Sequence, residues 1–85
     1  MKFTMRMLDE DREQSVRVLR LYLGVREATE LQKALDVLLK NPEENEHRHV
    51  FARDMSSEIS VSIVTDIKLN AGGYTDLEHR IFFEG

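Results

Sequence analysis

The chain has 85 residues, of which 41% are hydrophobic and 33% are charged, and its formal net charge is −4 at pH 7. This length and composition predict a single soluble domain, residues 1–85, with a thin core. The acidic balance disfavours a nucleic-acid partner, because affinity for phosphates comes mainly from Lys and Arg. The chain has no cysteine, which excludes disulfides, thiolate nucleophiles and thiolate zinc sites and favours a reducing cytoplasm for so small a protein.

Two strands are predicted before Gly24. Residues 2–8 alternate between apolar and polar side chains, which is the period of a half-buried strand. A wholly polar run at residues 9–14 then predicts a hairpin loop. Residues 15–23 are apolar on both faces, a pattern typical of the centre of a sheet. One face carries Leu19, Leu21 and Leu23, and the other carries Val16, Val18, Arg20 and Tyr22.

The clearest element is an amphipathic helix at residues 26–40. Its apolar side chains recur at helical spacing and form one stripe: Ala28, Leu31, Ala34, Leu35 and Leu38. The end of the helix is marked by a cation in the last turn, Lys40, and then by Asn41 and Pro42, which favour a turn. We expect the stripe to pack on one face of a sheet, against the leucines of the second strand.

Two further strands are predicted after the helix, at residues 47–53 and 58–65, joined by a turn at residues 54–57. The alternation of the fourth strand is the clearest in the chain, and it continues in the same parity to residue 69. Residues 70–73 then predict a loop, because they contain two glycines.

The last segment, residues 74–85, has two interpretations. Thr75 followed by Glu78 matches a capping box, which favours a short helix. The alternation of Leu77, His79, Ile81 and Phe83 favours a fifth strand instead. We favour the strand, because consecutive Ile and Phe residues are β-prone.

These elements predict an α+β fold. The expected architecture is an antiparallel sheet of four or five strands in the order ββαββ, with a fifth strand possible at the C-terminus. One amphipathic helix packs on one face of that sheet, and the other face is left uncovered.

No motif in the chain predicts catalysis. The glycine pair at residues 72–73 lacks the lysine and the helix start of a phosphate loop. Neither acidic run has the glycine of a calcium loop. His47 and His49 project to one face of a strand and could share a cation, but the sequence fixes no third or fourth ligand. We therefore predict no enzyme, no catalytic residue, no cofactor and no metal site.

The uncovered sheet face and the acidic loops are the predicted partner-binding surfaces. The strand parity places Val16, Val18, Tyr22 and Val64, together with Val50, on that face. Clustered on adjacent strands, these side chains would form an apolar patch that a monomer rarely leaves exposed. A homodimer through this face is one way to cover it. The acidic residues predicted to meet a basic protein surface are Asp9, Asp11, Glu43 and Glu44.

The function predicted from these features is that of a small non-catalytic cytoplasmic interaction protein. An acidic protein of this size suits an inhibitor, immunity or antitoxin-like role of the kind carried by phages or plasmids. One alternative is an RNA- or ribonucleoprotein-binding module that stacks bases on Phe51, Tyr22 and Tyr74 near Arg20, Arg48 and Arg53. A second alternative is a homo-oligomer that binds a small ligand.

No stretch of the sequence approaches the length of about 18 apolar residues that a membrane span needs, so no membrane partner is expected.

Overall fold

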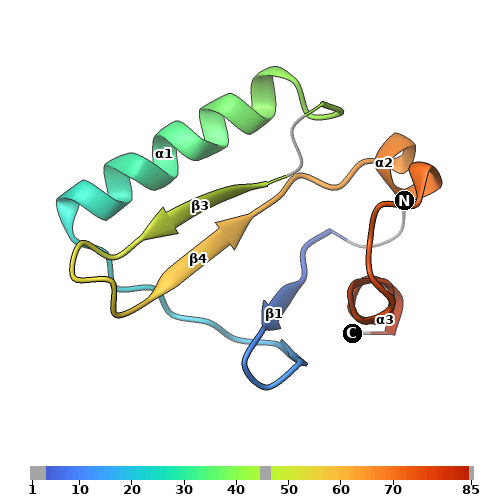
Figure 1. Ribbon diagram of the computed structural model, residues 1–85, viewed down its shortest axis with the longest axis horizontal. Helices are drawn as coiled ribbons and strands as arrows, with labels where there is room; N and C mark the ends of the chain where they lie inside the picture. The colour runs from blue at the N-terminus through green and yellow to red at the C-terminus, as the bar shows by residue number, and fades with distance from the viewer. Residues whose placement is uncertain (1–3, 45–46, 85) are drawn as a thin grey trace.

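The structure is a computed structural model that describes residues 4–44 and 47–84. It has the predicted α+β class, but the strands form two separate two-stranded antiparallel sheets rather than one sheet of four or five (Figure 1). The elements in chain order are β1 (Met7–Asp9), β2 (Gln14–Val16), α1 (Val25–Lys40), β3 (Arg48–Phe51), β4 (Glu58–Val61), α2 (Asp66–Ala71) and α3 (Asp76–Glu84).

The first hairpin is shorter than the alternation predicts. β1 pairs with β2 so that Met7 lies opposite Val16. The turn between them is closed by Asp9, whose Oδ1 accepts a hydrogen bond from the backbone N–H of Arg12 at 3.2 Å. The predicted strand at residues 2–8 is wrong for residues 4–6, which are irregular, and residues 1–3 lie outside the described residues.

The predicted second strand is wrong beyond Val16. Residues 17–24, here called the connector, form neither helix nor strand and run from β2 to the start of α1 (Figure 1). Its leucines were expected beneath the helix, yet Leu19, Leu21 and Leu23 are all exposed. The β3–β4 hairpin packs on α1 instead and buries Ala34 and Leu38 of the apolar stripe, while Leu35 of the same stripe remains 40% exposed.

The helix agrees closely with its prediction. It begins one residue earlier than expected, at Val25, and ends at Lys40, with Asn41 as its C-cap. α1 lies along the β3–β4 hairpin (Figure 1). Its side chains Ala34 (5% exposed) and Leu38 (0% exposed) are buried together with Val50 of β3 (4% exposed). These three residues form the main core.

The β3–β4 hairpin has one face under the helix and one face open to solvent. Its register places Val50 opposite Ile59 and Arg48 opposite Val61, and residues two apart in a strand share a face. Val50 was predicted on the uncovered face and is instead buried, so that prediction is wrong. The turn predicted at residues 54–57 is confirmed, because the Oδ1 of Asp54 accepts hydrogen bonds from the backbone N–H and hydroxyl of Ser56.

Two helices replace the strands predicted in the last third of the chain. The fourth strand ends at Val61, and α2 occupies the region where it was expected to continue. Thr65 caps α2 by accepting a hydrogen bond from the N–H of Lys68 at 3.2 Å. Gly72 ends it with a φ of 78°, which glycine adopts without steric cost.

The favoured fifth strand is also wrong, because residues 76–84 form α3. Thr75 and Glu78 make both reciprocal bonds of a capping box: the N–H of Thr75 donates to Glu78 Oε1 at 2.9 Å, and the N–H of Glu78 donates to Thr75 Oγ1 at 3.1 Å. These bonds satisfy N–H groups that a helix start otherwise leaves without partners. Local capping therefore outweighs the β propensity of Ile81 and its neighbours.

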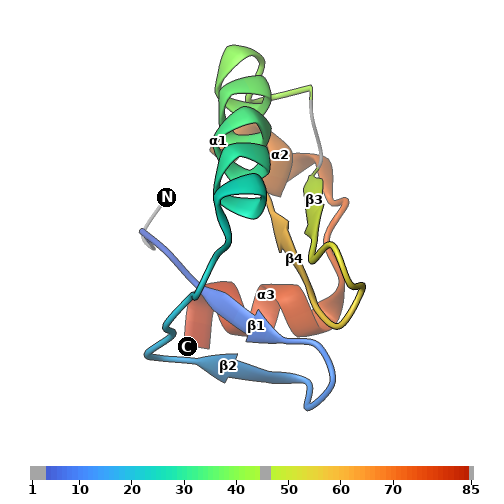
Figure 2. The same cartoon turned by 90° about the vertical axis from the view of Figure 1, so that its left-hand side faces the viewer.

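α3 lies behind the β1–β2 hairpin and is tied to the start of the chain (Figure 2). The Nε of Arg6 donates a hydrogen bond to the backbone carbonyl of Ile81 at 3.1 Å. The Ile81 side chain is 5% exposed. Among the described residues of α3, it is the only buried one.

The molecule is a thin slab. Its principal extents are 36 × 31 × 18 Å and its radius of gyration is 13.5 Å, whereas a compact chain of 85 residues has about 12 Å. Much of its apolar side-chain surface therefore remains in contact with water.

Candidate functional site

The acidic residues predicted to bind a partner lie at opposite ends of the molecule. Asp9 and Asp11 are in the β1–β2 hairpin, while Glu43 and Glu44 follow the far end of α1 (Figures 1 and 2). Glu43 accepts a hydrogen bond from the hydroxyl of Thr65, which links that loop to the start of α2. The four carboxylates do not form one surface.

The predicted apolar patch is not formed either. Val18 and Tyr22 are strongly exposed in the connector, whereas Val16 in β2 and Val64 after β4 are half-buried in different parts of the chain. Val50 lies beneath α1. These residues therefore do not share the face through which the dimer was predicted to form.

The uncovered face of the β3–β4 hairpin carries a row of aromatic rings instead, here called the ring row: His47, His49 and Phe51. Each side chain is exposed. The rings of His49 and Phe51 are stacked, with centroids 5.7 Å apart and planes at 23°. His47 meets His49 edge-to-face at 4.7 Å. The spacing of two residues in a strand is the sequence signal for this row, and Phe51 shares that spacing with the two histidines.

The central ring of the row is held in place from the neighbouring strand. The hydroxyl of Ser60, directly opposite His49 in the register, lies 2.7 Å from His49 Nδ1. Glu58 Oε2 lies 3.4 Å from the same nitrogen. The hydrogen bond to Ser60 restricts the orientation of the ring before anything binds, so the row presents a defined shape.

The histidine pair does not extend to a metal centre within the described residues, where no three His, Asp or Glu side chains are placed to hold an ion. The Nδ1 of His49 already has protein partners. A structural cation site of the usual kind needs about four ligands. The ring row is therefore a candidate for macromolecular contact through its ring faces.

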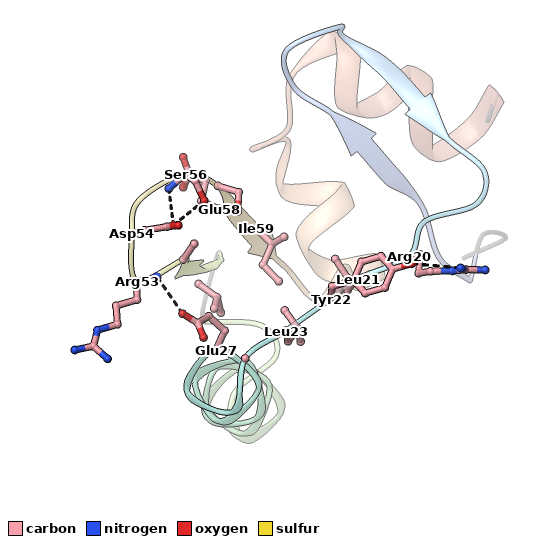
Figure 3. Close-up of a pocket in the computed structure, with 14 residues that line it drawn as sticks. Arg20, Leu21, Tyr22, Leu23, Glu27, Arg53, Asp54, Ser56, Glu58 and Ile59 are labelled. Atoms are coloured by element: carbon pink, nitrogen blue, oxygen red, sulfur yellow. Dashed lines mark hydrogen bonds between the residues drawn. The ribbon is translucent and has the colours of Figure 1, made fainter.

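A second surface is an open groove of about 800 Å³ between the connector and the turn of the β3–β4 hairpin (Figure 3). Leu23 of the connector and Ile59 of β4 lie on facing sides of it. At the hairpin end, Glu27 Oε2 accepts a hydrogen bond from the backbone N–H of Arg53 at 3.0 Å. The side chain of Arg53 points away from the groove.

At this end of the groove, the carboxylates of Glu27 and Asp54 each accept a hydrogen bond from a backbone N–H, and both have lowered pKa values. The N–H of Arg53 is the main reason that the pKa of Glu27 lies below its ordinary value of 4.5. For Asp54, the hydroxyl of Ser56 and then its N–H lower the pKa. Glu27 reaches its partner by folding back over Gly24, where an added Cβ would lie 2.7 Å from Glu27 Oε1. These groups fasten the start of α1 to the hairpin turn.

Replacing Glu27 is therefore expected to make the stability of the protein less dependent on pH. Because the pKa is lower in the folded state, the stabilisation is complete above 4.5, is lost as pH falls through the folded pKa, and is absent below both values. Urea midpoints of wild type and Glu27→Gln should differ at neutral pH and converge in acid. Glu30→Gln, on the exposed face of the same helix, is the control; an equal effect there would contradict this role.

Further aromatic side chains gather on α3. Tyr74 and Phe82 meet edge-to-face at 5.1 Å, and His79 stacks on Phe83 at 6.2 Å. The aromatics predicted as an RNA platform are consequently dispersed. Phe51 is in β3, Tyr22 in the connector, and Tyr74 before α3.

No protein-family model, characterised protein or solved structure matches this chain. Among the helices of the described residues, none is long and apolar enough to cross a membrane.

Proposed function

We propose that this chain is a small, non-catalytic, cytoplasmic protein that binds another protein through the ring row on the uncovered face of the β3–β4 hairpin. The observation that carries the proposal is the stacked and anchored pair His49 and Phe51. Aromatic side chains are enriched in the centres of protein interfaces and supply most of the binding energy there.

The anchoring of His49 bears directly on affinity. A flexible side chain loses about 0.5–1.5 kcal/mol of conformational freedom when an interface immobilises it. The hydrogen bond to Ser60 has already restricted the His49 ring in the free protein. The loss of conformational entropy on binding is then smaller, so a row of only three rings can act as a binding centre.

The net charge of −4 favours a basic partner surface, because complementary fields accelerate association and disfavour wrong partners. The acidic groups at both ends of the molecule, Asp11 and Glu44 among them, contribute to this long-range field without touching the ring row. An inhibitor, immunity or antitoxin-like protein fits this combination of small size, acidity and a preformed docking face.

The test is affinity capture from a lysate of the source cells, treated with nuclease. The double variant His49→Ala/Phe51→Ala is compared with Phe83→Ala, which removes an exposed Phe from α3 instead (58% exposed, against 44% for Phe51). We expect wild type and Phe83→Ala to capture the same protein and the double variant to capture about tenfold less, the loss typical of removing a binding hot spot. Equal capture by all three would contradict the proposal.

The stacked rings also favour one alternative, an RNA-binding surface, because bases stack on exposed aromatic side chains. Arg48 does not lie beside the rings, because it is adjacent in sequence to both histidines and therefore points to the opposite face of the strand. Retention of labelled single-stranded oligonucleotides at physiological salt, lost in Arg48→Gln/Arg53→Gln and in the ring-row variant, would select this alternative over a protein partner.

A further inference from the structure

The connector contains six residues, 18–23, that have the composition of a strand but no strand partner. In the described part of the chain, the backbone N–H and C=O groups of these residues make no hydrogen bond. Five of the six side chains are large and apolar and all five are exposed, up to 78% for Val18 and 81% for Tyr22. Unpaired backbone beside exposed apolar side chains is a template for another strand.

The surface area of the molecule is larger than that of a compact monomer. The chain exposes 6985 Å² to solvent, while a compact monomer of 9.9 kDa exposes about 5,200 Å². The excess of about 1,800 Å² is roughly twice the area of about 800 Å² that each partner buries in a standard interface. A second copy of the chain could therefore bury an area typical of a stable interface and still leave part of this excess exposed.

We infer that residues 18–24 pair with the same residues of a second copy as an antiparallel two-stranded ribbon centred on Leu21, giving a twofold homodimer. In this register Leu21 faces the same residue of the second copy, Leu19 faces its Leu23, and Arg20 faces its Tyr22. All six backbone-unpaired residues then acquire a strand partner.

The register follows from side-chain chemistry. Residues directly opposite one another in an antiparallel pair lie on the same face. Centring on Leu21 places all six leucines of the two segments on one face. The other face then pairs each Arg20 guanidinium with a Tyr22 ring, which is a favourable cation–π arrangement. A shift by one residue would set Arg20 opposite Leu21 and mix the two faces.

This self-complementarity is the reason that the occupant is a second copy. A twofold interface requires that a surface fit itself, and residues 19–23 of the segment do so in side-chain type. The leucine face also suits the surroundings, since Leu21 and Leu23 border the groove opposite Ile59 (Figure 3). The dimer contact therefore lies along the connector, away from the ring row.

The absence of cysteine from the sequence allows a direct test of the register. Antiparallel partners have Cα atoms about 4.5–5.5 Å apart, within the range that a disulfide can bridge. We expect Leu21→Cys to form a disulfide-linked dimer under mild oxidation about tenfold faster than Leu39→Cys, because pairing raises the effective concentration of the thiols. Leu39 is also an exposed leucine, on α1. Equal rates would overturn the register.

Light scattering tests the dimer itself. The wild type should have a mass near twice 9.9 kDa at high concentration, and Leu21→Lys should return it to the monomer mass, because two ammonium groups would face each other at the twofold axis. Leu21 is exposed in the single chain, so circular dichroism of the variant should be that of a folded protein. A monomeric wild type would overturn the inference.

This inference does not rest on the proposed function, and the two can fail separately. Leu21→Lys alters the dimer contact without touching the ring row, and His49→Ala/Phe51→Ala alters the ring row without touching the connector. A partner captured by both wild type and Leu21→Lys, with a monomeric wild type in solution, would overturn only the dimer. A dimer that captures nothing would leave the inference standing and remove the proposed function.

Discussion

Leu38→Ala is expected to lower the free energy of unfolding by about 2–5 kcal/mol, the range measured for removing a buried leucine side chain. Leu38 is the one fully buried large side chain of the described residues. It lies where α1 meets Val50 of β3, so its loss leaves a cavity at the contact that joins the helix to the hairpin. Since a chain of this size has a total stability of about 4–13 kcal/mol, the variant should unfold at a much lower urea concentration than the wild type.

The matched control is the next residue along the same helix. Leu39 is 64% exposed, and Leu39→Ala should change stability by less than about 0.5 kcal/mol, as expected for a surface substitution. Urea denaturation followed by circular dichroism, at one fixed protein concentration, measures both variants. If the two substitutions cost the same, α1 does not pack on the hairpin through the face described above.

Ile81→Ala is the second large effect, also expected to cost about 2–5 kcal/mol. Ile81 is 5% exposed and is the buried residue of α3, the helix that is tied to the start of the chain through Arg6. Its backbone carbonyl accepts the hydrogen bond from Arg6. Truncating the side chain leaves that carbonyl in place, so the measured loss reports packing and not the hydrogen bond.

Phe83→Ala, measured by the same denaturation, is the control for Ile81→Ala. Phe83 is in the same helix but is 58% exposed, so its replacement alters the helix without removing a buried side chain. We expect it to lose less than about 1 kcal/mol, with the stack on His79 as its main contribution. A tolerated Ile81→Ala together with a costly Phe83→Ala would mean that α3 presents its other face to the protein.

The sequence could predict α1 because all its signals agree. The stripe that contains Ala34 and Leu38 repeats at helical spacing, and Lys40, Asn41 and Pro42 mark one end. α2 and α3 have short apolar patterns that fit both a strand and a helix, and for such patterns the caps decide. Thr75 and Glu78 carried that information in the sequence, and so did Thr65 with Gly72, seven residues apart.

The arrangement of the strands could not be predicted in the same way. Alternation shows which side chains share a face, as it does for His47 and His49, but not which face a helix will cover. Val50 was placed on the wrong side for that reason. Alternation in residues 18–23 likewise shows a strand-forming composition without identifying a partner, and no strand pairs with this segment within the described part of one chain.

The single charge in that segment has a consequence for solubility. Residues 18–23 are otherwise a short, exposed, β-prone run without proline, the kind of sequence from which amyloid fibrils grow. In a parallel, in-register fibril, identical side chains stack about 4.8 Å apart, so a column of Arg20 guanidinium groups would repel itself. In the closed dimer each Arg20 meets a tyrosine. One arginine therefore acts as a gatekeeper, permitting association of two chains while opposing open-ended growth.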